Sequence, residues 1–247
     1  MNEILCKQMA IDYCCTDADV MDKDNHFSIH QELYGRRIFE KEKDCFLKIA
    51  AINGKLLFSG QEEIIRWCKN EYATTGSEWF FEARNLRKLN NKLFGNGYQI
   101  AMVHPFFIAE TRSEINVKDY EIHWYAGDEI EQFRGDDRFG EAFSFWPDAP
   151  DVLGVAALRN GNILGMAGAS LDSPTMWQIG INVDNGLRNS GIGKLLVTLL
   201  KNEILERGIL PYYGTSMSHI ASQRVALGAG FVPAWTELIT SKTVIEN

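Results

Sequence analysis

The sequence predicts an α/β protein built of two units. Three observations lead to this prediction. Short apolar runs of strand length alternate with amphipathic stretches of helical length, two Asn-Gly pairs stand between such runs, and charge and cysteine usage change along the chain. Asn-Gly between two β-prone runs is typical of a tight hairpin turn, because both central residues of that turn need positive φ. The length of 247 residues fits two domains of ordinary size.

Charge and cysteines separate the two parts of the chain. Residues 1–150 hold 26 acidic and 18 basic side chains, whereas the rest of the chain holds seven of each. This acidic excess argues against nucleic acid as the main partner. The five cysteines all fall within residues 6–68, their number is odd and no CxxC occurs. We therefore expect reduced thiols, and with neither a secretory signal nor a long apolar stretch, a cytoplasmic protein away from the membrane.

In the first part, the pair Asn53-Gly54 predicts a hairpin between strands at residues 45–52 and 55–58. Ser59 stands three residues before Glu62, a spacing that fits a capping box at the start of a helix through residue 72. Further elements are expected in this order: a helix at 82–93 and strands at 98–103 and 106–109.

The second part reads more clearly. Residues 177–183 alternate apolar with polar or small side chains, which predicts a strand with one apolar face. Leucine and isoleucine then recur at helical spacing from Ile192 to a C-cap at Gly208. The other expected elements are a strand at 121–125, short helices within 134–151, strands at 152–158, 163–169, 210–215 and 232–240, and a helix at 218–229. We place the domain boundary near residue 115, giving units 1–115 and 116–247.

The glycine-containing loop between the strand at 177–183 and the helix that follows it predicts an anion site. The first N–H groups of a helix lack internal partners, and the helix dipole adds partial positive charge there. Gly191 and Gly193 would let a phosphate approach the backbone. The loop is not an ATP-type P-loop, because Ile192 stands where lysine is required, and Leu196 breaks the GxGxxG fingerprint. A plain turn without a ligand is the alternative.

Arg188-Asn189-Ser190-Gly191-Ile192-Gly193 resembles the [Q/R]-x-x-G-x-[G/A] pattern of the GNAT superfamily of acyl-CoA-dependent N-acyltransferases. The resemblance covers about residues 150–240 and implies a mixed, mostly antiparallel sheet flanked by helices. Residues 208–238 look most like a subset that includes antibiotic self-resistance acetyltransferases. The first unit carries no motif of the family. Its role is open between shaping the substrate site and being a degenerate second copy of the fold.

The resemblance implies acetyl-CoA as co-substrate and no metal. Its pyrophosphate would lie on the loop backbone beside Arg188, and its pantetheine arm would pair with the strand before the loop. Ser222 matches a family position on the last helix. The residues implied in binding are Ile181, Asn182, Val183, Arg188, Asn189, Ser190, Gly191, Ile192, Gly193, Lys194 and Ser222.

The catalytic groups are harder to name. Ala226 stands where the family often has a tyrosine that protonates the leaving thiolate, and His219 replaces an asparagine. A base is needed because only a neutral amine can attack the thioester. His219 is the candidate base, with a structural histidine as its alternative. Tyr213 is the candidate acid, and further candidates are Tyr212, Asp172 and Glu237.

We therefore expect an N-acetyltransferase that moves an acetyl group to a primary amine of a small molecule by direct attack in a ternary complex. No cysteine follows Cys68, so the second unit offers no thiol nucleophile. The acceptor is expected between the two units, and a homodimer is compatible with the sequence. The alternatives are a non-catalytic acyl-CoA sensor and an interaction protein without CoA.

One acidic stretch resembles a metal site. It contains Asp17, Asp19, Asp22, Asp24 and His26, yet an EF-hand counted from Asp22 would place Phe27 at the required glycine and Leu33 at the required glutamate. We therefore expect a solvated acidic loop that caps helices.

Overall fold

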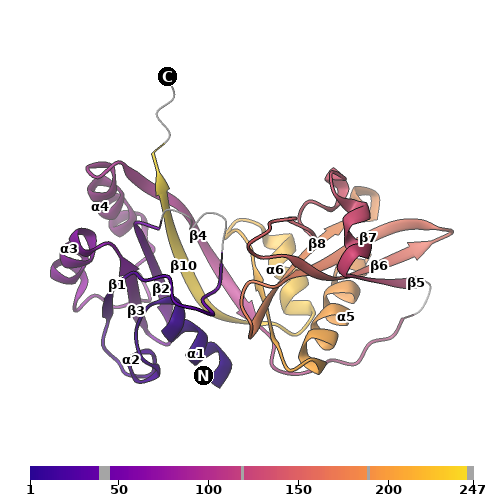
Figure 1. Cartoon of the computed structure of the whole chain (residues 1–247), viewed down its shortest axis with the longest axis horizontal. Helices are drawn as coiled ribbons and strands as arrows, with labels where there is room; N and C mark the ends of the chain where they lie inside the picture. Colours follow the sequence, from indigo (N-terminus) through magenta and orange to yellow (C-terminus); the bar gives the residue numbers. More distant parts are fainter. Residues whose placement is uncertain (39–44, 118–119, 188–189, 244–247) are drawn as a thin grey trace. The chain divides into compact units, whose positions relative to one another are not determined.

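The computed structural model describes residues 1–38, 45–117, 120–187 and 190–243 (Figure 1). The chain divides into two compact units. Residues 1–106 together with 234–243 form the first, and residues 107–233 form the second. The boundary that the sequence suggested, near residue 115, lies a few residues beyond this division. The last strand, which we had assigned to the second unit, groups mainly with the first.

The first unit combines helices with a small mixed sheet. Strand β2 pairs antiparallel with both β3 and β10, while β1 pairs parallel with β3. Its elements are α1 (Glu3–Asp12), α2 (Asp17–Met21), β1 (His26–Ile29), β2 (Leu47–Ile52), β3 (Lys55–Gly60), α3 (Glu62–Tyr72), α4 (Ala83–Phe94), most of β4 (Tyr98–Ile108) and most of β10 (Val232–Lys242).

The predicted hairpin of the first unit is confirmed, with Asn53 at φ 51° and Gly54 at φ 80°. The capping box is wrong, because Ser59 belongs to β3 and pairs with Lys48 in the sheet. The N-cap of α3 is Gln61, whose side chain makes no capping bond. The two strands expected around residues 104–105 form one continuous strand, β4. Proline can stay within a strand where its missing N–H is not needed by a ladder.

A network of buried charges joins distant segments of the first unit. Arg37 donates to Asp12 and to both carboxylate oxygens of Glu237, at 3.1 and 3.3 Å for the latter. Tyr13 Oη and Trp235 Nε1 also donate to Glu237, at 2.7 and 3.0 Å. All five side chains are buried. The network therefore ties α1 and the segment after β1 to the final strand.

The second unit contains a sheet in which β5, β6, β7 and β8 pair antiparallel in sequence order and β9 pairs parallel with β8. The predicted mixed, mostly antiparallel sheet flanked by helices is thus confirmed. The elements are β5 (Glu121–Ala126), the 3₁₀ helices η2 (Gly127–Phe133) and η3 (Asp137–Phe139), β6 (Asp151–Arg159), β7 (Asn162–Ser170), β8 (Met176–Val183), η4 (Asn185–Leu187), α5 (Ile192–Glu206), β9 (Leu210–Gly214) and α6 (Ile220–Gly228).

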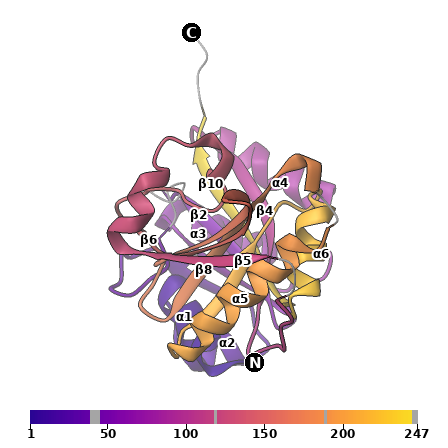
Figure 2. The same cartoon turned by 90° about the vertical axis from the view of Figure 1, so that its right-hand side faces the viewer.

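Each face of this sheet is covered by a different part of the chain (Figure 2). On one face, Trp177 and Ile179 of β8 pack into a core with the apolar side of α5. On the other, Phe139 and Phe143 from the connection between β5 and β6 pack with Met166. The alternation of side chains along β8, expected from the sequence, therefore separates two cores.

Three glycines in register let that connection lie directly on the sheet. Gly154, Gly168 and Gly180 are aligned across β6, β7 and β8. A methyl group at Gly168 or Gly180 would collide with the carbonyl oxygen of Ala142 or Glu141. The glycines are thus required by a close approach of backbone to backbone.

The state of the cysteines and the length of the described helices can be compared with the sequence predictions. The five cysteines at positions 6, 14, 15, 45 and 68 form no disulfide bond. No helix within the described ranges is both long and apolar enough to cross a lipid bilayer.

Candidate functional site

The candidate site is built where β8 ends and α5 begins. After β8, Asp184 turns the chain by accepting a bond from the N–H of Gly186 at 2.8 Å, and the Asp184 carbonyl accepts from Leu187 at 2.9 Å. Gly191 is the N-cap of α5 and has φ 89°. Because side chains rarely adopt this left-handed conformation, glycine is needed here for the loop to enter the helix.

The start of α5 offers backbone donors to an anion. The N-cap Gly191 provides no side-chain capping bond, so the first N–H groups of the helix, from Ile192 to Lys194, have no such partner. Gly191 and Lys194 are exposed, whereas Ile192 and Gly193 are buried. A methyl group at Gly193 would lie 3.3 Å from a methyl of Val225 on α6, so this glycine serves close helix packing. A helix start with such N–H groups is a type of site that can bind a phosphate.

Next to this loop, the last part of strand β8 has an edge that pairs with none of the described strands. Its pairing with β9 covers only Met176 to Gln178, although β8 continues to Val183 and β9 to Gly214. The Leu210 N–H donates to the Thr175 carbonyl on the β9 side, and the Asp184 N–H donates to Leu164 on the β7 side. Since backbone groups of successive strand residues alternate sides, odd-numbered residues face β9.

Ile181 and Val183 therefore present their N–H and C=O groups to an edge where no pairing with β9 is recorded among the described residues. Such an edge can accept an extended chain as an added strand. Asn182 instead turns its side chain to the polar face. There its Oδ1 accepts bonds from the N–H groups of Glu141 and Ala142, at 2.9 and 2.8 Å.

Two of the predicted side chains meet at the site. Tyr213 Oη on β9 lies 2.8 Å from Ser222 Oγ on α6. Burial raises the pKa of Tyr213, the hydrogen bond with Ser222 lowers it, and the negative charge of Glu141 raises it further. Tyr213 thus stays protonated at neutral pH and can donate a proton.

His219 occupies a different environment. It is the exposed N-cap residue of α6, and its side chain makes no capping bond. Its ring has no hydrogen-bond partner among the residues that the structure describes. Ala226, at the position where the family often has tyrosine, is fully buried in the core beside α5.

The other candidates lie apart from the loop. Tyr212 Oη donates to Asp172 and to Gln178, the latter at 3.1 Å, and both Tyr212 and Asp172 are buried. Glu237 lies in the buried charge network of the first unit, where its interactions with Arg37 and Lys48 lower its pKa despite burial. Its carboxylate therefore contributes to the fold of that unit.

Glu141 was not singled out in the sequence. It follows η3, is exposed, and its carbonyl lies over Gly180. The signal that could have identified it is the glycine row in β6, β7 and β8, because small residues aligned across a sheet allow another chain segment to approach.

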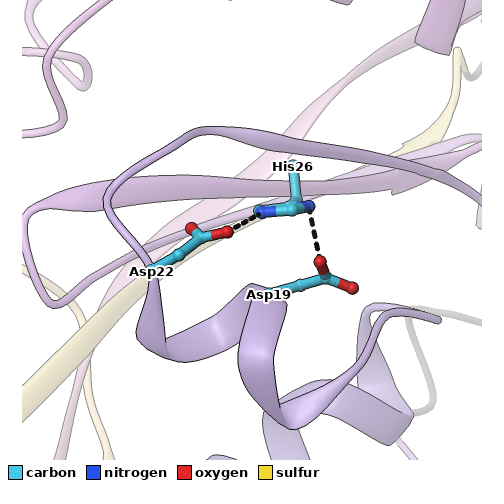
Figure 3. Close-up of side chains that lie close together, drawn as sticks. All are labelled: Asp19, Asp22 and His26. Carbon is cyan, nitrogen blue, oxygen red and sulfur yellow. Dashed lines mark hydrogen bonds and ion pairs between the residues drawn. The ribbon is translucent and has the colours of Figure 1, made fainter.

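The acidic stretch near the N-terminus brings three potential metal ligands together (Figure 3). Ligand atoms of Asp19, Asp22 and His26 lie within 4.8 Å of one another. His26 Nε2 is 2.8 Å from Asp22 Oδ2, and Lys55 Nζ forms an ion pair with the other oxygen of Asp22. These partners lower the pKa of Asp22. Thr16 and Asp19 form a capping box on α2, so helix capping accounts for part of this stretch.

Two of the implied binding residues, Arg188 and Asn189, lie outside the described part of the chain. The remaining ones are contributed by β8, by Ser190 and Gly191 before α5, by the start of α5 and by α6, all within residues 107–233.

Comparison with known proteins identifies the second unit. A model of the acetyltransferase (GNAT) family matches residues 114–231. The solved structures include a GCN5-related N-acetyltransferase-like protein from Streptococcus suis, 12% identical, with a TM-score of 0.47 over 84% of this chain and 89% of that one. They also include a GNAT acetyltransferase from Colwellia psychrerythraea, 17% identical, with a TM-score of 0.46 over 79% and 81%.

A GCN5-related N-acetyltransferase from Kribbella flavida is likewise 17% identical, with a TM-score of 0.47 and coverage of 64% of each chain. No match to a curated protein was found. The narrower resemblance to antibiotic self-resistance enzymes has no support in these comparisons. The match to the acetyltransferase (GNAT) family thus covers residues 114–231, which lie within the second unit.

Proposed function

We propose that the protein transfers an acetyl group from acetyl-CoA to the primary amine of a small molecule. The observation that carries the proposal is the combination of the left-handed Gly191 at the start of α5 with the free edge of β8 beside it. The family uses acyl-CoA. The loop and the strand edge supply the two kinds of backbone donor that a pyrophosphate and an amide-containing arm require.

In this reading, the N–H groups of Ile192, Gly193 and Lys194 receive the pyrophosphate, together with the loop residues before them. Ile181 and Val183 pair with the pantetheine arm through their backbones. A backbone N–H of β8 then polarises the thioester carbonyl, as donors in an oxyanion hole do. The amine attacks the thioester carbon directly, and the thiolate of CoA leaves.

Tyr213 is the proposed donor of a proton to the departing thiolate. Its hydroxyl is held by Ser222 and its raised pKa keeps the proton in place until a stronger base forms. We retain His219 only as a candidate base that would have to act from an exposed position at the start of α6.

The first test is isothermal titration of the protein with acetyl-CoA, repeated with Gly191→Trp. A side chain at φ 89° strains the loop and fills the space of the phosphate, so we expect binding to weaken at least about tenfold. Gly161→Trp is the matched control, because Gly161 also has positive φ, at 76°, but lies in the turn between β6 and β7. Equal binding by Gly191→Trp and the control would refute the assigned phosphate site.

A protein that only senses acyl-CoA is the second candidate, since β8 carries Gln178 and no carboxylate on its polar face. It would bind acetyl-CoA in the same titration. Free CoA, measured with a thiol reagent, would then not increase when primary amines are added.

A further inference from the structure

The proposed reaction needs a group that removes a proton from the acceptor. A primary alkylamine is mostly an ammonium ion at neutral pH, and its nitrogen has no lone pair for attack until that proton leaves. The polar face of β8 presents Gln178, Gly180 and Asn182, none of which is a base. A base for this face must therefore come from a segment that lies over it.

Residues 141–142 form such a segment. The carbonyl of Glu141 lies against Gly180, two residues beyond the point where β9 stops pairing with β8. The side chain of Asn182 holds the segment on the sheet, because its Oδ1 accepts hydrogen bonds from the N–H groups of both Glu141 and Ala142. The backbone of Glu141 is thus positioned by two residues of the strand that would hold the thioester.

The carboxylate of Glu141 is available for a ligand. The side chain is exposed, and its oxygens have no hydrogen-bond or ion-pair partner in the described ranges. Two other acidic side chains of the same connection are held in ion pairs, Glu131 with Arg134 and Asp136 with Arg138. Glu141 also lies close enough to Tyr213 for its charge to act on that hydroxyl.

We propose that Glu141 binds the ammonium group of the acceptor and acts as the general base of the transfer. This assignment rests on the proposed function. Glu141 takes one proton from the ammonium, and the freed lone pair forms the N–C bond to the thioester carbon. The C–S bond breaks, its electron pair leaves on the CoA sulfur, and Tyr213 supplies the proton that gives CoA-SH. The nitrogen loses its second proton as the amide forms, and this proton restores the Tyr213 hydroxyl. The Glu141 proton then passes to solvent.

The test compares two classes of amine in wild type and Glu141→Gln. The alkylamine probes are propylamine, phenethylamine and spermidine, which must lose a proton to react. Hydroxylamine is already largely neutral at pH 7 and needs no base. We expect Glu141→Gln to slow CoA release with the best alkylamine by about a hundredfold or more, while the rate with hydroxylamine changes little. Glu141→Asp should restore part of the alkylamine rate.

Asp148→Asn is the matched control, because Asp148 is another exposed carboxylate of the same connection. It should leave both rates at the wild-type level. Equal alkylamine rates in Glu141→Gln and wild type would overturn the assignment. An equal loss with both amines would also overturn it, since that pattern indicates a structural role. Wild type that binds acetyl-CoA but releases CoA with none of the probes counts against it too.

A second measurement does not depend on activity. In protein labelled with ¹³C at the tyrosine ring carbon bearing the hydroxyl, the Tyr213 signal is assigned by its loss in Tyr213→Phe. Because the charge of Glu141 raises the pKa of Tyr213, Glu141→Gln should lower that pKa. An unchanged Tyr213 titration would overturn the placement of Glu141. Failure of the proposed function is seen separately, as absence of acetyl-CoA binding by wild type.

Discussion

The two units join distant segments of their chain in different ways. In the first, Arg37, Asp12 and Glu237 lie against one another within the core, and each carboxylate has further hydrogen-bond donors. In the second, one stretch of backbone lies directly on another, where Glu141 and Ala142 lie on Gly180 and Gly168. A buried charge network joins segments far apart in sequence. The glycine row instead places one exposed side chain, that of Glu141, over β8.

The two kinds of contact also differ in their energetic requirements. Charges removed from water are tolerated only when they are paired, and losing one partner leaves the others uncompensated. Backbone contact through glycine needs no charge compensation, but it leaves no room for a side chain. Substitutions should therefore affect the first unit through electrostatics and the second through steric overlap.

The largest effect is expected from Arg37→Met, which leaves Asp12 and Glu237 buried without their shared cation. We expect a loss of about 3–5 kcal/mol in the free energy of unfolding, measured by urea denaturation. Arg66→Met is the control. Arg66 pairs with Glu62 on the surface, with side chains 74% and 68% exposed, so its removal should cost at most about 1 kcal/mol. Similar losses in both variants would contradict the role of the network.

Gly180→Ala should have the next largest effect. The added methyl collides with the Glu141 carbonyl, so the connection must shift, at a cost of about 1–3 kcal/mol in unfolding free energy. The control is Gly140→Ala, because Gly140 has φ −65° and an added methyl there lies 3.9 Å from its nearest neighbour. If Gly180→Ala proves as stable as Gly140→Ala, the close approach is not required.

A smaller effect concerns pH and the first unit. Burial, together with the positive charges of Lys48 and Arg36, lowers the pKa of His30 to about 4. In the unfolded chain, His30 binds a proton as the pH falls through about 6.5, whereas in the folded protein it stays neutral at that pH. The stabilising contribution of neutral, buried His30 to the free energy of unfolding is therefore complete above about pH 6.5. It is lost as the pH falls toward 4.

His30→Asn tests this contribution. Denaturation curves between pH 7 and pH 4.5 should show a smaller decrease of stability in the variant than in wild type. A decrease of the same size in both proteins would exclude His30 as its source. Glu237 does not confuse the test, because its pKa is lowered from 4.5 and its contribution falls only at more acidic pH.

Local patterns in the sequence predicted most of the second unit. The alternation along β8 and the leucine spacing of α5 were sufficient, because each follows directly from strand or helix geometry. The sequence missed the 3₁₀ helices η2 and η4 of the second unit, and of the short helices expected within 134–151 the structure has η3. The other elements that it missed lie in the first unit. Helix α1 has a mixed polar and apolar pattern around its circumference, and the five-residue α2 is held mainly by the capping box of Thr16 and Asp19.

The sequence predicted those residues of the candidate site whose role depends on backbone geometry. Gly191 is needed for its φ and Ile181 for its position on an edge, and both follow from the order of strand, loop and helix. Glu141 was not predictable in this way. Its place depends on residues about 40 positions further along the chain, Gly180 and Asn182, which only the folded sheet brings beneath it.

The return of β10 to the first unit has a consequence for the order of folding during synthesis. Residues 107–233 are contiguous and can complete their unit as they leave the ribosome. The N-terminal unit, although made first, must wait for Glu237 before Arg37 has its full set of carboxylates. The part of the chain that emerges earliest is thus the last to complete its fold. A chaperone that binds nascent chains would therefore act mainly on this N-terminal part.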